Sequence, residues 1–210
     1  MFSELIEHLR SELAYYHPRE IRFRRALAQR DARYDAANGV DTTSFLNLKK
    51  LSIASLNRRY GVPHIATPPE EFSRAMAALP VRHEDYAFID LGSGKGRALL
   101  LAAAFPFRRL IGVEFAQELH EIARENLSGR SSVELYCMDA TEYGFPDGPL
   151  IVFLYNPFGP AVMAKVAQRL SGRPSTYVVY INPLHVDSWL KAGFRVIARG
   201  EPFMILSTRP

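Results

Sequence analysis

The chain has 210 residues, of which 48% are hydrophobic and 23% are charged, and it carries a formal net charge of +4. This length and composition predict a globular domain with a sizeable core and exclude a low-complexity chain. No stretch reaches the roughly 18 apolar residues of a membrane span and no signal-peptide pattern is present, so we expect a cytoplasmic protein without a membrane partner.

The positive charge is concentrated in the N-terminal part of the chain. Residues 1–60 contain 11 Lys or Arg and 7 Asp or Glu, whereas residues 61–210 contain 15 of each kind. Helical patterns are predicted at Phe2–Tyr16 and Arg19–Asp35, separated by Pro18. The second pattern is rich in arginine and predicts either a solvated helix face or a contact with an acidic partner. Aromatic residues do not alternate with these arginines as a base-stacking surface requires, so nucleic acid is not indicated.

Prolines mark the next boundary in the chain. Pro63, Pro68 and Pro69 predict an extended linker, because a residue that precedes proline disfavours helix. A helix is then expected at residues 69–79, with proline and two acidic residues suited to its first turn. We therefore expect an N-terminal helical arm at residues 1–66, acting as a cap or substrate region, and a separate domain at residues 67–210.

From Tyr86 onward, short apolar segments alternate with helical patterns. Alternation of this kind predicts an α/β fold, with a doubly wound, mostly parallel sheet and helices on both faces. The last two predicted strands are joined only by the short segment "ARGEP", residues 198–202, which leaves too few residues for a crossover helix, so these strands should pair antiparallel. The seven strands are predicted at 86–91, 110–114, 133–137, 150–155, 176–181, 194–198 and 203–207, and the helices between them at 96–105, 116–127, 161–171 and 185–192.

A glycine-rich turn follows the first strand, in "FIDLGSGKGRALLL". It is not a P-loop, because Lys95 is followed by Gly96 in place of a hydroxyl residue, and Ile89 occupies the position of the first glycine. It also departs from the dinucleotide turn, which needs a glycine where this chain has Arg97, whose side chain opposes close packing of helix on strand. The pattern that remains is D-x-G-x-G-x-G, formed by Asp90, Gly92, Gly94 and Gly96.

Bare backbone at this turn allows the strand to turn sharply into a helix and allows a ligand to approach closely. The acid at the strand end suits a cationic amine better than a pyrophosphate, since its charge repels phosphate. This segment resembles the first motif of the class I S-adenosylmethionine-dependent methyltransferases. Three later segments are similar to the further motifs of that family in the same order: "LIGVEFAQELHEIARENL", "VELYCMDATEY" and "IVFLYNPFG".

The resemblance spans residues 67–208, which makes residues 67–210 the expected methyltransferase catalytic domain. It implies a Rossmann-like, seven-stranded sheet that ends in the antiparallel hairpin, preceded here by an N-terminal helical extension. It also implies S-adenosyl-L-methionine as the cofactor. The residues that the family's motifs assign to the cofactor site are Asp90, Gly92, Ser93, Gly94, Gly96, Glu114, Phe115, Asp139, Ala140 and Asn156.

Each of these positions has an expected role by resemblance. The glycine turn with Asp90 holds the methionine part of the cofactor, and Glu114 accepts hydrogen bonds from the ribose hydroxyls with its two carboxylate oxygens. Asp139 and the backbone of Ala140 meet the adenine, and Phe115 packs against its edge. Taken alone, Glu114 would be interpreted as an acid near a helix N-terminus and Asp139 as a loop former, but together at these spacings they favour the ligand roles. Thr67 either lies over the cofactor or belongs to the N-terminal cap region of the helix that follows it.

The end of the fourth strand bears on the methyl acceptor. "LYNPFG" resembles the [DN]-P-P-[FY] motif of methyltransferases that act on amino or amide nitrogen, which assigns a catalytic role to Asn156. One proline is missing here, so Phe158 stands one position early, and Asn-Pro also forms turns and recurs as Asn182-Pro183. A nitrogen acceptor and a purely turn-forming role for Asn156 therefore both remain open.

The acceptor itself is not identified by any motif. "LGSGKG" with an N-terminal extension is similar to histone-lysine and other protein-lysine methyltransferases, which favours a protein amine or a small molecule over nucleic acid. No metal ion is expected, because methyl transfer mainly requires alignment in a dry pocket. The alternatives are a non-catalytic nucleoside-binding domain, which would not need Glu114 and Asp139, and an aminopropyl transferase of the same fold. No pattern indicates an oligomeric state.

Overall fold

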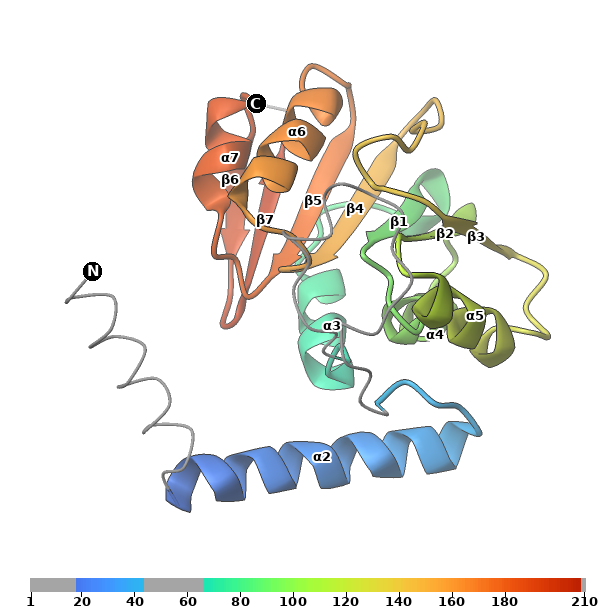
Figure 1. Ribbon diagram of the computed structural model, residues 1–210. Helices are drawn as coiled ribbons and strands as arrows, with labels where there is room; N and C mark the ends of the chain where they lie inside the picture. The colour runs from blue at the N-terminus through green and yellow to red at the C-terminus, as the bar shows by residue number, and fades with distance from the viewer. Residues whose placement is uncertain (1–17, 44–65, 209–210) are drawn as a thin grey trace.

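The computed structural model describes residues 18–43 and 66–208 of the chain (Figure 1). The helix predicted at Phe2–Tyr16 and the linker around Pro63 lie outside the described residues. The helix predicted at Arg19–Asp35 is confirmed as α2, Pro18–Asn38, with proline at its first position, where a missing backbone N–H costs little. Gly39 follows in the left-handed region with a φ of 64°, which is the usual way for a helix to end.

The helix predicted after the prolines is confirmed as α3, Pro69–Ala77. Phe72, Ala75 and Met76 form its buried face, at the spacing of a helix that packs on a core with one side. Pro68 is its N-cap residue and Thr67, one position earlier, is buried. None of the described helices is long and apolar enough to cross a membrane.

Seven strands form one sheet in the order β3-β2-β1-β4-β5-β7-β6. The strands from β3 to β5 run parallel, and β7 pairs antiparallel with both β5 and β6, so the predicted parallel sheet and its terminal hairpin are confirmed. The strands are β1 Ala87–Leu91, β2 Arg109–Glu114, β3 Val133–Cys137, β4 Leu150–Tyr155, β5 Thr176–Ile181, β6 Arg195–Arg199 and β7 Phe203–Ser207.

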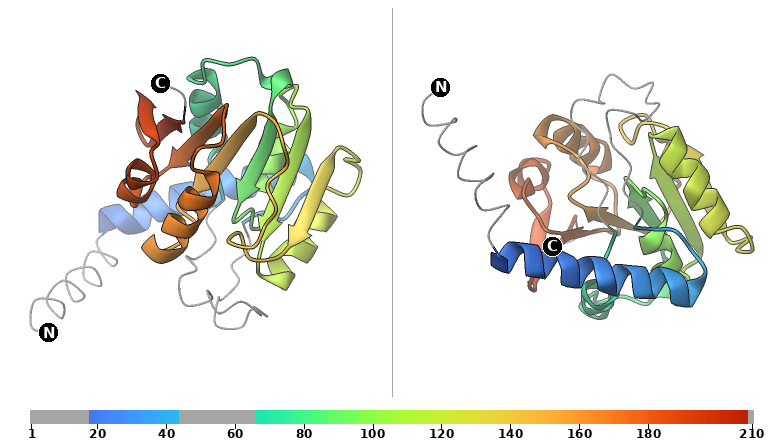
Figure 2. Two further views of the ribbon diagram at one scale, coloured as in Figure 1. Left: turned by 90° about the horizontal axis from the view of Figure 1, so that it is seen from above. Right: turned by 60° about the horizontal axis from the view of Figure 1, so that its bottom comes forward.

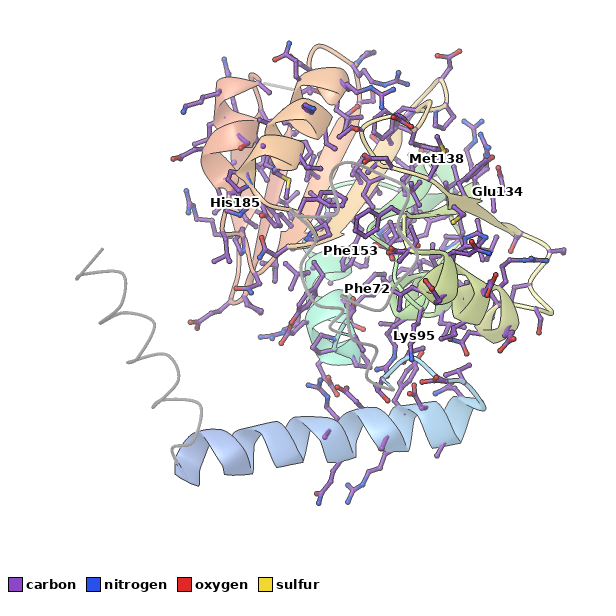
Figure 3. All side chains as sticks on the ribbon, viewed as in Figure 1. Phe72, Lys95, Glu134, Met138, Phe153 and His185 are labelled. Atoms are coloured by element: carbon purple, nitrogen blue, oxygen red, sulfur yellow. The ribbon has the colours of Figure 1, made fainter. Side chains whose placement is uncertain are left out.

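Helices cover both faces of the sheet and create two hydrophobic cores. One core joins α3, α4 and Leu127, which follows α5, to the sheet, and Figure 3 shows Phe72 of α3 beside Phe153 of β4 within it. The other core lies under α6 and α7 and contains the buried Trp189. The bounds of these helices are α4 Arg97–Ala102, α5 Gln117–Asn126, α6 Pro160–Leu170 and α7 Val186–Lys191, with a short 3-10 helix η3 at His83–Asp85.

Helix α2 lies outside these layers. It runs past α3, and its C-terminal end lies toward the start of α4, as the views in Figures 1 and 2 agree. The neighbours of β1 in the sheet are β2 on one side and β4 on the other, so the chain reverses its direction of winding there. In open α/β sheets, ligands bind at the carboxyl ends of the strands beside such a reversal.

Candidate functional site

The four polar residues predicted from strand ends come together at one edge of the sheet. Asp90 lies in β1, Glu114 ends β2, and Asp139 and Asn156 follow the neighbouring strands β3 and β4. All four are between 4% and 7% exposed. A polar side chain buried this deeply needs a partner, from the protein or from a ligand.

The glycine turn requires glycine for conformational reasons. Gly92, Gly94 and Gly96 have φ values of 76°, 51° and 86°, all in the left-handed region that disfavours a side chain. Gly92 also continues the sheet, because its N–H donates to the carbonyl of Val113 at 2.8 Å, and the N–H of Ser93 shares the same carbonyl at 3.1 Å. The turn is therefore held against β2 before it enters α4.

Gly92 is also required by packing. A Cβ built on it would lie 2.5 Å from the Cβ of Pro157 and 3.6 Å from the ring of Phe158. Carbon atoms that are not bonded separate by at least about 3.5 Å at their optimum. The loop that carries Asn156 therefore sits directly on the glycine turn, so the two candidate motifs form one site.

Glu114 supports the glycine turn with its carboxylate. The N–H of Gly94 donates to Oε2 at 2.8 Å, and the N–H of Ala116, the N-cap residue of α5, donates to Oε1 at 2.9 Å. Each carboxylate oxygen accepts more than one hydrogen bond, so capacity for a ligand's hydroxyl groups remains. Glu114 therefore does contact the N-terminus of α5, as its alternative role predicted. This contact leaves lone pairs for the predicted hydrogen bonds with the ribose hydroxyls.

Asp90 has the most perturbed carboxyl group of the site. Burial, reinforced by the nearby charge of Glu114, raises the pKa of Asp90 to about 8. Burial also raises the pKa of Glu114, although the N–H groups of Ala116, Gly94 and Phe115 lower it. Within residues 18–43 and 66–208 no group donates a hydrogen bond to the Asp90 carboxyl. This pair fits a ligand that brings positive charge and hydroxyl donors.

Asp139 shapes the loop that follows β3, which is the loop-forming role given above as the alternative to adenine binding. Oδ1 of Asp139 accepts hydrogen bonds from the backbone N–H of Thr141 at 2.8 Å and from its hydroxyl at 2.7 Å. Aspartate commonly shapes loops in this way. Ala140 is buried beside it and Phe115, which follows β2, is half-buried, so all three lie at the predicted edge of the sheet.

Asn156 has a strained backbone and a fixed side chain. Its φ is 43°, a left-handed conformation that asparagine tolerates better than most residues, and Asn182 at the second Asn-Pro has a φ of 48°. The hydroxyl of Tyr180 donates to Oδ1 of Asn156 at 2.8 Å and accepts the N–H of His185 at 3.3 Å. Burial raises the pKa of Tyr180 to about 12, so this hydroxyl keeps its proton at neutral pH.

Some residues around the site were not predicted from the sequence. Tyr180 reads as one more apolar residue of a buried strand, and nothing local indicates its hydrogen bond to Asn156. Lys95 and Arg97 could have been noticed in the sequence, because they are charged residues between two apolar segments. They are 0% and 1% exposed, and their side chains reach the segment around the end of α2. Among the described residues no three His, Cys, Asp or Glu side chains are arranged to hold a metal ion.

Comparison with known proteins agrees with this geometry. Residues 88–171 match the family described as a methyltransferase domain. An RNA methyltransferase from Salinibacter ruber, solved with S-adenosyl-L-homocysteine, is 23% identical with a TM-score of 0.50, over 68% of this chain and 91% of that one. A putative RNA methyltransferase from Pyrococcus horikoshii is 17% identical with a TM-score of 0.53, over 76% and 93%. A search of curated proteins finds no match.

A third solved structure, a SAM-dependent methyltransferase from Leishmania major, is 15% identical with a TM-score of 0.52, over 66% of this chain and 69% of that one. At these identities the likeness concerns the fold. The match of residues 88–171 to the methyltransferase-domain family and the shared fold support the resemblance to class I S-adenosylmethionine-dependent methyltransferases that the motifs carry. The buried acids at the ends of β1 and β2 fit S-adenosyl-L-methionine, which carries an amine, a sulfonium and ribose hydroxyls.

Proposed function

We propose that this chain transfers the methyl group of S-adenosyl-L-methionine to a nitrogen atom held beside Asn156. The observation that carries this proposal is the fixed amide of Asn156, whose oxygen is oriented by the Tyr180 hydroxyl at 2.8 Å. An amide oxygen has two lone pairs, so one remains to accept an N–H of the acceptor. Such a bond would turn the nitrogen's own lone pair toward the methyl group.

The residues that would hold the cofactor follow from the site. Asp90 would accept hydrogen bonds from the amine, and Glu114 would accept them from the ribose hydroxyls with its remaining lone pairs. Asp139, Ala140 and Phe115 would surround the adenine. When bound, S-adenosyl-L-methionine supplies a methyl group on a positively charged sulfur, which is also the leaving group. The protein then needs to align the acceptor and exclude water.

A nitrogen acceptor agrees with the protonation state of the residue that contacts Asn156. Tyr180 keeps its proton at neutral pH, because burial raises its pKa to about 12, so it is not a base for a hydroxyl acceptor. A neutral amine needs no base before it attacks. We assign recognition of the acceptor to the N-terminal arm, residues 1–66, because specificity in this family usually comes from segments added around the sheet.

The test is transfer of a tritium-labelled methyl group from the cofactor into fractionated cell lysate. We expect label in protein or in small molecules, resistant to mild alkali, because N-methyl groups survive conditions that hydrolyse methyl esters. The nucleic-acid fraction is measured in parallel, because two structural neighbours are described as RNA methyltransferases and α2 is rich in arginine. Alkali-labile label would contradict the nitrogen acceptor.

The same experiment separates the alternatives. A chain that binds the cofactor but labels no fraction would be the non-catalytic nucleoside-binding domain. Transfer of an aminopropyl group from the decarboxylated cofactor would indicate the other alternative. Neither is favoured, because the matched family is a methyltransferase domain and because the end of β4 carries Asn156 instead of an additional acid for a polyamine.

A further inference from the structure

Two charged residues at the glycine turn contact the segment around the end of α2. Lys95 lies within the turn and Arg97 begins α4, and both side chains are almost completely buried. Figure 3 shows Lys95 directed toward the segment that follows α2. Burying a positive charge is costly unless it is paired and hydrogen-bonded, so the partners of these two residues identify a built contact.

Arg97 is held by the last turns of α2 and by the segment after it. Its Nη2 donates to Oδ1 of Asp35 at 3.0 Å, and its Nε donates to the hydroxyl of Thr42. Its Nη1 lies 3.7 Å from Oδ1 of Asp31, and its guanidinium lies 3.9 Å from the centre of the Tyr34 ring. One buried cation therefore contacts two carboxylates, a hydroxyl and an aromatic face of the same segment.

Hydrogen bonds from Thr42 and Thr43 fix the carboxylate of Asp35 that contacts Arg97. It accepts hydrogen bonds from the N–H of Thr42 at 2.9 Å and from the hydroxyls of Thr42 and Thr43 at 2.6 Å each. These bonds and the charge of Arg97 lower the pKa of Asp35 although burial opposes them. The carboxylate thus closes a loop after α2 and presents one oxygen to Arg97.

A second contact joins the same segment to the turn. Nζ of Lys95 lies 3.0 and 3.1 Å from the two carboxylate oxygens of Asp41, which is 48% exposed. Asn126, the last residue of α5, accepts the N–H of Asp41 at 2.9 Å and donates to its carbonyl at 2.8 Å. The same amide nitrogen of Asn126 donates to the carbonyl of Lys95 at 2.9 Å. The backbone of the turn and the backbone of the segment are therefore tied to one side chain.

We propose that residues 31–43 hold the glycine turn in its binding shape. Lys95 and Arg97 are the positioning residues, because their side chains make the contacts that join the turn to this segment. Three glycines in the left-handed region give the turn little conformational preference of its own, so its shape depends on contacts from outside. Glu114 and Val113 supply such contacts from β2, and residues 31–43 supply further contacts through Lys95 and Arg97. This inference rests on the proposed cofactor role of the turn.

The consequence is energetic coupling between the N-terminal part of the chain and the cofactor. If docking of residues 31–43 favours the binding shape of the turn, cofactor binding must favour docking by the same factor, because coupling free energies are reciprocal. An acceptor that engages the N-terminal arm would then alter cofactor affinity through Lys95 and Arg97, without touching the cofactor.

Asp41→Asn is the sharpest test, because Asp41 is half exposed and its removal should leave the fold intact. We expect faster amide hydrogen exchange at residues 92–97 in the cofactor-free protein and about tenfold weaker binding of S-adenosyl-L-methionine. Asp41→Glu should restore both, since a longer carboxylate can still reach Lys95. Glu84→Gln is the matched control, because it breaks the exposed Arg82–Glu84 ion pair of 2.7 Å, which involves neither the turn nor residues 31–43.

Asp35→Asn tests the buried contact in the same way and is measured well below its melting temperature. Normal exchange at residues 92–97 together with wild-type affinity in both folded variants would overturn the proposal, whatever happens to the melting temperature. If the wild-type protein bound no cofactor, the proposed function would fail. The exchange measurement would then show on its own whether residues 31–43 order the turn.

Discussion

The backbone N–H of Gly94 donates a 2.8 Å hydrogen bond to Oε2 of Glu114, which lies 20 positions later in the chain. One carboxylate therefore supports the glycine turn from β2 and also faces the edge of the sheet where the ribose is expected. Support of the glycine turn affects the stability of the fold, whereas binding of the ribose affects cofactor affinity. Different substitutions of Glu114 can therefore separate the two roles.

Glu114→Gln should weaken binding of S-adenosyl-L-methionine by roughly a hundredfold, because the amide keeps one acceptor oxygen and places an NH2 donor at the other position, so charge-assisted hydrogen bonds worth about 1.5–3 kcal/mol each are lost or become neutral. Glu114→Ala should bind as weakly and should also unfold more easily, because the N–H groups of Gly94 and Ala116 lose their acceptor. Calorimetry and denaturant unfolding measure the two effects, with the exposed Glu142→Gln as the control. Wild-type affinity in folded Glu114→Gln would remove the ribose role.

Cofactor binding should release a proton from Asp90. The pKa of this carboxyl is raised to about 8 by burial, so it is protonated in the free protein at about pH 6.5, where an α-amino group, whose pKa is about 7.7–8.0, is still charged. A bound cation favours the ionised carboxylate and lowers that pKa, so the proton leaves and affinity rises with pH toward 8. Binding heats in buffers of different ionisation enthalpy count the released protons.

Asp90→Asn provides the control for this count. It keeps the shape of the side chain but has no proton to lose, so its binding should be weaker and should release fewer protons than the wild-type protein. Equal proton release by the two proteins would mean that another group titrates on binding.

Asn156→Gly should separate the side chain of Asn156 from its turn. Glycine keeps the left-handed backbone at φ 43° but removes the amide, so turnover should fall by about 10²-fold or more while cofactor affinity falls much less. Tyr180→Phe should have a smaller effect in the same direction, because it leaves the amide in place but unoriented. The labelled-lysate experiment supplies the acceptor for this measurement.

Asn182→Gly is the matched control for Asn156, since Asn182 also precedes a proline in the left-handed region but is exposed. It should keep full activity. If Asn156→Gly did so too, Asn156 would serve only the turn, and the main support for a nitrogen acceptor would be lost.

Gly92→Ala should cost much more stability than Gly172→Ala. The two glycines have similar φ values, 76° and 72°, so both substitutions carry the left-handed penalty of about 1–2 kcal/mol. A Cβ at Gly172 meets nothing within 4 Å, whereas a Cβ at Gly92 would lie 2.5 Å from Pro157 and must push the Asn156 loop away. Denaturant unfolding of the two variants measures the difference, and equal losses would show that Pro157 moves freely.

Most of the architecture could be predicted from local sequence patterns. The succession of strands and helices along the chain, the doubly wound sheet and the terminal hairpin were predicted from periodicity and from the short connection between β6 and β7, and each strand lies within about one residue of its prediction. Helix α4 is shorter than predicted, ending at Ala102 where residues 96–105 were expected, and helix ends are the least determined feature of such patterns. The acids at the strand ends could be located because parallel strands bring their carboxyl ends to one edge.

Glycine spacing and strand ends are local properties, so the sequence was enough to predict where the turn needs residues without side chains and which acids meet at the sheet edge. The partners of the buried polar side chains depend instead on tertiary packing. Arg97 finds Asp35 62 positions earlier, Tyr180 orients Asn156 24 positions earlier, and Pro157 packs on Gly92. Periodicity indicates that a side chain is buried but not which distant group satisfies it, since that depends on how whole elements pack.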